Sequence, residues 1–163
     1  ELDEHHVTTS TQLVSDLPLV QGHAGQLREV LLNLLQNAIE AMAPTVNRPR
    51  LISIATSHVG AGAVVISLRD TGPGIKPQAP TSIFDPFVTT KTKGTGLGLA
   101  ICKMIVEQHG GELSATSGND GGTQFEITLP VGAYDRAIPH PSRKETAAFS
   151  PSAEAKGDHV QPK

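Results

Sequence analysis

Two asparagines, Asn33 and Asn37, stand four residues apart in a leucine-rich stretch of the sequence. Residues at this spacing lie on one face of a helix, so both side chains would point the same way. Asparagine is a poor helix former because its side chain competes with the backbone for hydrogen bonds. The pair is therefore either two solvated surface amides, which the spacing alone favours, or two neutral oxygen ligands turned toward a cation.

A carboxylate and two glycines follow an apolar segment at residues 70–75, in the pattern Asp-x-Gly-x-Gly. Asp70 could accept hydrogen bonds from an exocyclic amine. Glycines let the backbone approach a flat ring closely. Taken alone, however, this pattern is also that of an ordinary turn.

A third group lies in the loop 83–91, which runs into the glycine-rich segment 94–99. A glycine-rich turn that leads directly into a helix presents free N–H groups at the positive end of the helix dipole, which suits phosphate. Lys91 would add a positive charge. The order is neither that of a Walker loop nor that of a dinucleotide fingerprint. Phe84 and Phe87 either pin this loop to the core or contact a ligand.

The elements that must position these groups are read from periodicity and turn signals. A fourth pattern, Gly-Gly-Thr-x-Phe at 121–125, is by itself a hairpin signal. The sequence predicts two short strands around Pro18 within 7–21, a helix over 27–42 ended by Pro44, strands over 51–57 and 63–70, a long loop over 71–95, a helix over 96–109, and strands over 112–117 and 123–129.

Length and composition set the frame. The 163 residues carry 13 basic and 16 acidic side chains, a net charge of −3, so no strong basic field for nucleic acid is expected. The sequence has no run of about 18 apolar residues, so it predicts no membrane span. It has one cysteine, Cys102, which excludes an internal disulfide. We expect one α/β domain over 1–131 and a disordered tail over 132–163. Because the chain begins at Glu1, we expect a piece of a longer protein or a processed product.

Together, the order and spacing of the four patterns resemble the catalytic ATP-binding domain of bacterial sensor histidine kinases. This family belongs with gyrase B, the ninety-kilodalton chaperones and MutL. Segments 87–91 and 94–100 look most like the nitrogen-regulatory and oxygen-sensing kinases. The resemblance implies an α/β (α+β) two-layer sandwich of the Bergerat type, with a mixed sheet packed on helices and a mobile lid over ATP.

The resemblance also implies roles for individual residues. Asp70 would bind the adenine amino group, Gly74 would line the base and Thr123 would support that site. Asn37 would hold Mg²⁺, and Asn33 would hydrogen-bond phosphate or a metal-bound water. The implied nucleotide-binding set is Asn37, Asp70, Gly72, Gly74, Ile75, Phe84, Phe87, Thr90, Lys91, Gly94, Gly96, Leu97, Gly98 and Thr123, and the implied catalytic set is Asn33, Asn37 and Lys91.

The implied reaction is transfer of the γ-phosphoryl group of ATP to a histidine on a dimerisation hairpin. The related ATPases carry a general-base Glu where this sequence has Asn33, which favours a kinase with an imidazole acceptor. The implied partners are that hairpin, a response regulator receiver domain and a second copy of the parent kinase. The implied location of the domain is the cytoplasm, whether or not the parent kinase is anchored in a membrane. None of the seven histidines has the acceptor context: His5, His6, His23, His58, His109, His140 and His159.

Two alternatives remain beside this reading. One is an ATPase of the gyrase or MutL kind, and the other is a non-catalytic nucleotide-binding or dimerisation module. Robust steady-state hydrolysis by the isolated chain would favour the first. ATP binding without phosphorylation of an added acceptor hairpin would favour the second.

Overall fold

The computed structural model describes residues 7–45, 48–60, 62–75, 82–89, 94–118 and 121–132. Within these ranges the helices and strands follow the predicted order, apart from the N-terminal segment. In chain order they are β1 (Thr8–Gln12), α1 (Ala24–Met42), β2 (Leu51–Val59), β3 (Ala63–Asp70), the short 3-10 turn η1 (Ser82–Phe84), α2 (Gly98–Gln108), β4 (Glu112–Ser117) and β5 (Thr123–Pro130).

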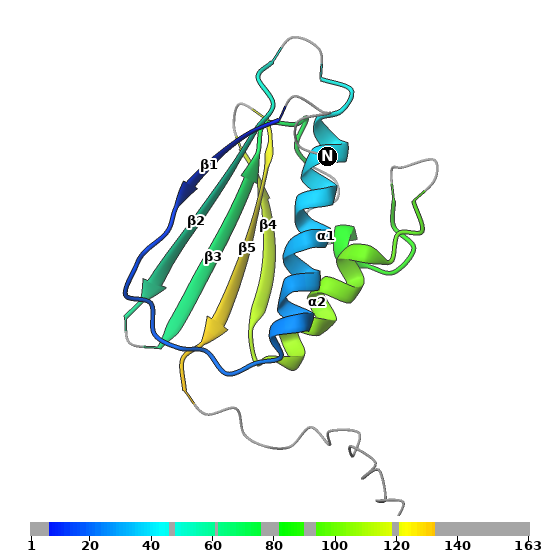
Figure 1. Cartoon of the computed structure of the whole chain (residues 1–163). Helices are drawn as coiled ribbons and strands as arrows, with labels where there is room; N and C mark the ends of the chain where they lie inside the picture. The colour runs from blue at the N-terminus through cyan, green and yellow to red at the C-terminus, as the bar shows by residue number, and fades with distance from the viewer. Residues whose placement is uncertain are drawn as a thin grey trace, which may run out of the picture.

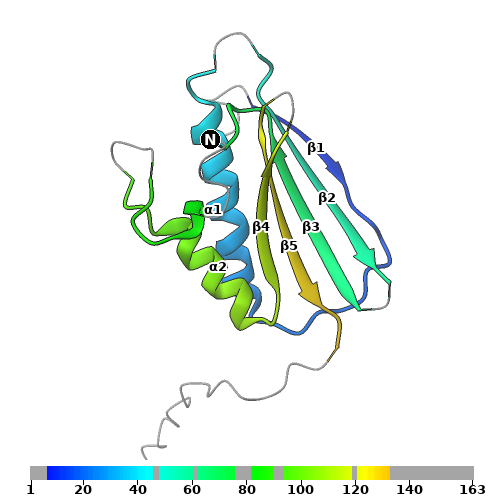
Figure 2. The ribbon, with the colours of Figure 1, turned by 180° about the vertical axis from the view of Figure 1, so that it is seen from behind.

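The five strands form one sheet in the order β1-β2-β3-β5-β4. β1 runs parallel to β2, and the other neighbours are antiparallel, so the sheet is mixed as predicted. Figure 1 shows α1 and α2 side by side on one face of the sheet, and the view from behind in Figure 2 agrees. This arrangement confirms the two-layer α/β sandwich.

The hydrophobic core lies between the helices and the sheet, because alternate strand residues point to one face. In β5 the residues facing the helices are buried and the intervening ones are only partly so. The core is mainly aliphatic, with two phenylalanines, one methionine and one cysteine. Its buried members are Val30, Leu34, Ala38, Ile39 and Met42 of α1, Ile52, Leu68, Leu113, Phe125, Ile127 and Leu129 of the sheet, Cys102, Ile105 and Val106 of α2, and Phe84.

Helix α1 is fixed at both ends by side chains. His23 is its N-cap, and the ring Nδ1 accepts a hydrogen bond from the Gln26 N–H at 3.3 Å. At the other end the Arg50 guanidinium donates to the carbonyls of Ala43 and Thr45. These bonds satisfy backbone groups that have no partner within a helix.

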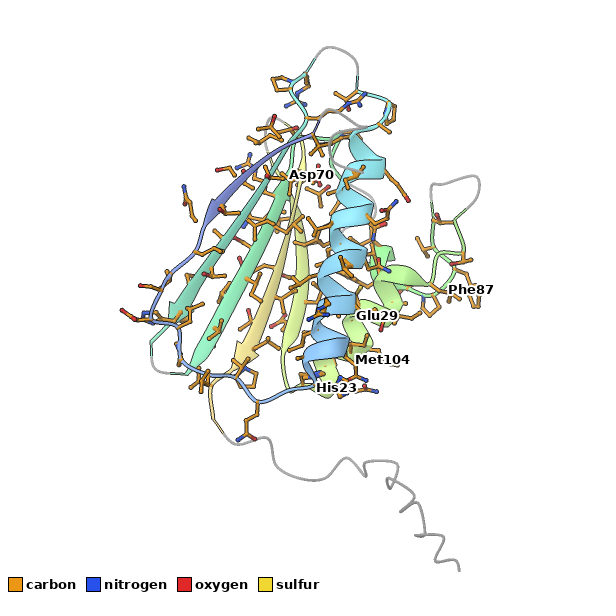
Figure 3. The ribbon with its side chains drawn as sticks, in the orientation of Figure 1. His23, Glu29, Asp70, Phe87 and Met104 are labelled. Atoms are coloured by element: carbon orange, nitrogen blue, oxygen red, sulfur yellow. The ribbon has the colours of Figure 1, made fainter. Side chains whose placement is uncertain are left out.

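Helix α2 begins at Gly98, two residues later than predicted, because Gly96 has a φ of +68° and cannot be helical. Its C-terminal end is joined to the start of α1 through the buried His109. The ring Nδ1 donates to the Ile105 carbonyl at 2.7 Å, and Nε2 accepts from the His23 N–H at 2.9 Å. The two helices are therefore linked at the end of the molecule remote from Asp70 (Figure 3).

The prediction of two short strands around Pro18 was wrong in its second half. β1 lies before Pro18, but after it only a single bridge forms, between Val20 and Gly132. Proline has no N–H to give to a ladder, and the partner of Val20 comes from the far end of the domain. The predicted tail beyond Gly132 lies outside the described residues. No described helix has the length and apolar character to span a membrane.

Candidate functional site

Asp70 stands at the end of β3 and is the most buried charged residue among those described, with 1% of its surface exposed. Its Oδ1 accepts hydrogen bonds from the Gly72 N–H at 2.7 Å and the Thr123 N–H at 3.2 Å. These donors belong to the Asp-x-Gly-x-Gly turn and to the Gly-Gly-Thr segment, which are about fifty residues apart in sequence. Asp70 is therefore the point at which the two predicted patterns meet.

Burial raises the pKa of Asp70 above the ordinary aspartate value, because the charged form loses hydration. Hydrogen bonds from Gly72 and from the backbone and side chain of Thr123 oppose this effect. Oδ1 is thus committed to the protein backbone. The carboxylate accepts further hydrogen bonds best when it is ionised.

The glycines around Asp70 are required by close packing. Gly122 has a φ of +82°, and a Cβ there would collide with the Asp70 carbonyl oxygen. Its N–H donates to the Gly72 carbonyl at 2.7 Å. Gly74 has a φ of +81°, and a Cβ there would lie 3.0 Å from the Gly122 carbonyl oxygen. The two turns therefore lie directly against each other, which side chains would prevent.

The sequence reasoning missed Ser117, which is bonded to this assembly. Its Oγ accepts from the Ile75 N–H at 2.6 Å and donates to the Ile75 carbonyl at 3.0 Å. The available signal was weak, since a serine that ends a strand before a glycine turn is common. Thr71 has a comparable structural role, because its hydroxyl donates to the Pro49 carbonyl at 2.6 Å.

Asn33 and Asn37 share one face of α1, as predicted, and bond to each other. The Asn37 Nδ2 donates to the Asn33 Oδ1 at 2.9 Å, with both side chains half-buried. A Cβ on Gly98 would lie 2.9 Å from that same Oδ1. The first residue of α2 therefore packs directly against the asparagine pair.

The start of α2 is the phosphate site that the sequence predicts. Its N-cap, Leu97, makes no side-chain capping bond, and the first N–H groups of a helix have no partner within the helix. Just before it, Gly96 is pressed against Phe87: the Phe87 N–H donates to the Gly96 carbonyl at 3.0 Å. A Cβ on Gly96 would lie 2.6 Å from the Phe87 carbonyl carbon. The glycine-rich turn and the loop before it are thus in backbone contact.

The two phenylalanines of the loop differ in their surroundings. Phe84 is 8% exposed, lies in the core and has the Lys103 Nζ 5.7 Å from its ring centroid. Phe87 is 76% exposed and has a φ of +68°, a conformation that is rare for residues other than glycine. Core packing explains Phe84 without a ligand, whereas Phe87 projects from its loop (Figure 3). Nucleotide contacts from either ring stay predictions.

The predicted residues fall into two groups in the structure. Asp70, Gly72, Gly74, Ile75 and Thr123 gather at one end, with Asp70 between the sheet and α1 (Figure 3). We call this group the carboxylate end. Asn33, Asn37, Phe87, Gly96, Leu97 and Gly98 gather around the start of α2, and we call this group the amide end. Gly94 precedes the second group, and Thr90 and Lys91 lie outside the described residues.

The amide end has a donor set that fits magnesium. Mg²⁺ retains several waters and accepts phosphate oxygens, so one protein oxygen is sufficient. Because the Asn37 Nδ2 is bonded to Asn33, the amide is held in one orientation and its Oδ1 lies on the opposite arm. Within the described ranges, no three acidic, histidine or cysteine side chains come together as a metal site.

These features define a class of protein. Residues 22–133 match the family described as histidine kinase-, DNA gyrase B-, and HSP90-like ATPase, and the chain belongs to this family. It is 41% identical over 128 residues to the C4-dicarboxylate transport sensor protein DctS of Rhodobacter capsulatus, covering 78% of this chain. The chain spans only 19% of the length of DctS.

Solved structures agree with this family. The nucleotide-free catalytic domain of histidine kinase ThkA has a TM-score of 0.69 at 32% identity, covering 80% of this chain and 82% of that one. Histidine kinase ThkA in complex with response regulator protein TrrA has a TM-score of 0.66 at 28% identity, and the match covers 80% of this chain and 36% of that one. Full-length ShkA in complex with AMPPNP has a TM-score of 0.68 at 30% identity, and the match covers 82% of this chain and 27% of that one. The fold is that of a histidine kinase catalytic domain.

Proposed function

We propose that this chain is the catalytic domain of a sensor histidine kinase, which binds Mg-ATP and transfers the γ-phosphoryl group to a histidine on a helical hairpin. The observation that carries the proposal is the contact between Gly98 and Asn33. It brings a predicted phosphate cradle beside the predicted Mg²⁺ ligand Asn37, with an amide at the position where the related ATPases have a carboxylate.

Each end of the site has a separate task in this proposal. At the carboxylate end, Asp70 accepts a hydrogen bond from the adenine amino group, and the turn around Gly74 forms a wall beside the base. At the amide end, the N–H groups at the start of α2 bind phosphate oxygens, and Asn37 holds the metal. Bound Mg²⁺ supplies charge neutralisation between the phosphates.

The chemical step follows from the lack of a base at residue 33. A neutral imidazole nitrogen of the acceptor attacks the γ-phosphorus, and the bond from that phosphorus to the β–γ bridging oxygen breaks. The phosphoryl group moves to the histidine, ADP leaves with the bridging oxygen, and the imidazole proton passes to a base of the acceptor's own segment. The chain contributes positioning and electrostatics.

The partners of the proposed kinase follow from the same reading. They are the hairpin with its acceptor histidine, a second copy of the parent, and a response regulator receiver domain. The complex of ThkA with a response regulator and the complex of ShkA with AMPPNP support the class of partner and of nucleotide. We propose that this domain lies in the cytoplasm, where ATP and response regulators are found. This location fits a parent kinase that is anchored in a membrane as well as one that is not.

The test uses the chain mixed with a helical hairpin that carries an acceptor histidine, and ATP labelled at the γ-phosphate. We expect label on the hairpin in a bond that is acid-labile and alkali-stable, as a phosphohistidine is. The Asn37→Ala variant should give no label. Release of inorganic phosphate by the chain alone at a comparable rate would instead indicate an ATPase. Binding of ATP without transfer would indicate a non-catalytic module.

A further inference from the structure

Ser117 is the last residue of β4, and its hydroxyl makes two bonds to a single residue of the carboxylate end. It accepts from the Ile75 N–H at 2.6 Å and donates to the Ile75 carbonyl at 3.0 Å. One hydroxyl thereby uses both its donor and an acceptor site on one peptide residue. This replaces the pair of bonds that a neighbouring strand would provide.

Other hydrogen bonds hold the start of the turn. Gly72 is fixed twice, since its N–H donates to Asp70 and its carbonyl accepts from Gly122. Beyond Gly72, the hydrogen bonds that the described residues 73–75 make are the two to Ser117. Among the hydrogen bonds of the described residues, those of Ser117 therefore hold the second half of the turn.

The glycine at position 74 fits the serine sterically. A Cβ built on Gly74 would lie 3.2 Å from the Ser117 Oγ and 3.0 Å from the Gly122 carbonyl oxygen. Gly74 is thus enclosed between β4 and the glycine turn before β5. Its positive φ and this narrow space are two independent signs that the turn is held in one conformation here.

We propose that Ser117 is a positioning residue for base recognition: by fixing Ile75, it sets the position of the 72–75 turn beside which Asp70 would bind adenine. This inference rests on the proposed function, because it assigns the carboxylate end to the base. Ser117 itself need not touch the nucleotide.

The test compares Ser117→Ala, Ser117→Thr and a matched control, Ser114→Ala, which makes the same change on the same strand away from the turn. Calorimetry would measure ATP and GTP binding with and without Mg²⁺. We expect Ser117→Ala to weaken ATP binding about tenfold, with or without metal, since two hydrogen bonds are lost. Discrimination between ATP and GTP should shrink with it. Ser117→Thr should restore both, and Ser114→Ala should change neither.

A second measurement does not depend on nucleotide. Hydrogen exchange at the Ile75 amide should be protected in the wild type and in Ser117→Thr, and should become fast in Ser117→Ala. Unchanged exchange in Ser117→Ala, or unchanged base discrimination despite faster exchange, would overturn the proposal. If the wild type binds no ATP while the exchange pattern holds, the proposed function fails and the role of Ser117 is a structural one.

Discussion

The carboxylate end and the amide end of the site are built in different ways. Around Asp70, the ends of three strands and two glycine turns are joined by hydrogen bonds, and the central carboxylate is 1% exposed. Around the start of α2, the asparagine pair is half-buried and Phe87 is 76% exposed. One end is a closed backbone assembly, whereas the other presents polar groups from two helices.

This difference indicates how binding energy would be divided. A wall that is already hydrogen-bonded loses little conformational entropy when a flat base binds, so base recognition at this end would be preorganised. Phosphates and a metal need charge compensation from several directions, and groups presented by helices can supply it. We therefore expect the fold to depend on the carboxylate end and metal-dependent affinity to depend on the amide end.

The largest expected effect concerns the fold. Gly122→Ala would place a methyl group against the Asp70 carbonyl at a φ of +82°, so we expect the free energy of unfolding to fall by about 3 kcal/mol. Gly60→Ala is the matched control, because Gly60 has a φ of +56° but nothing within 4 Å of its Cβ position. It should cost only about 1 kcal/mol. Equal losses in urea denaturation would show that the turns are not tightly packed.

The corresponding glycine of the amide end should affect binding more than folding. Gly98 is the first residue of α2, where Gly98→Ala gains less helix propensity than the ~1 kcal/mol of a helix interior, and the new methyl group would meet the Asn33 amide at 2.9 Å. We expect the free energy of unfolding to change by less than about 1 kcal/mol, while affinity for Mg-ATP falls about tenfold because Asn37 is displaced through Asn33. Metal-free affinity serves as the internal control. A loss in stability comparable to that of Gly122→Ala would remove the distinction between the two ends.

The smallest expected effect is a pH dependence. The raised pKa of Asp70 means that the folded carboxyl keeps its proton to a higher pH than the unfolded one. The folded state therefore binds more protons above the ordinary value of 3.8, and the free energy of unfolding falls as pH rises from there through the raised pKa. Asp70→Asn should make this decline shallower in urea titrations. Parallel curves for the two proteins would contradict the burial of an ionisable group at this end.

Much of the fold could be predicted from local patterns. The helix predicted over 27–42 and the strands predicted over 63–70 and 123–129 depend on neighbouring residues alone, and the structure confirms them as α1, β3 and β5. The strand predicted after Pro18 is only a single bridge between Val20 and Gly132. Local sequence patterns cannot show which distant segment pairs with Val20. The true start of α2 depended on the positive φ of Gly96, which contacts Phe87 in a distant part of the loop that no local pattern connects to it.

The site was predictable where glycines carried the signal and not where a common polar residue did. Asp70 and the glycine turns could be named because the order of the four patterns resembles a known family, although each pattern alone is that of an ordinary turn. Ser117 could not, since its importance arises only when β4 and the 72–75 turn meet. Likewise, the sequence did not decide whether Phe84 and Phe87 pin the loop to the core or contact a ligand. Only packing separates the buried ring from the exposed one.

The most direct test of the division between the two ends is an ATP titration of Asp70→Asn and Asn37→Ala, each with and without Mg²⁺, followed by calorimetry. We expect Asp70→Asn to lose about a hundredfold in affinity under both conditions, because a charge-assisted hydrogen bond to the base is removed. Asn37→Ala should match the wild type without metal and lose the gain that Mg²⁺ provides. If both variants lose affinity by the same factor with and without Mg²⁺, the separate assignment of base and metal to the two ends is wrong.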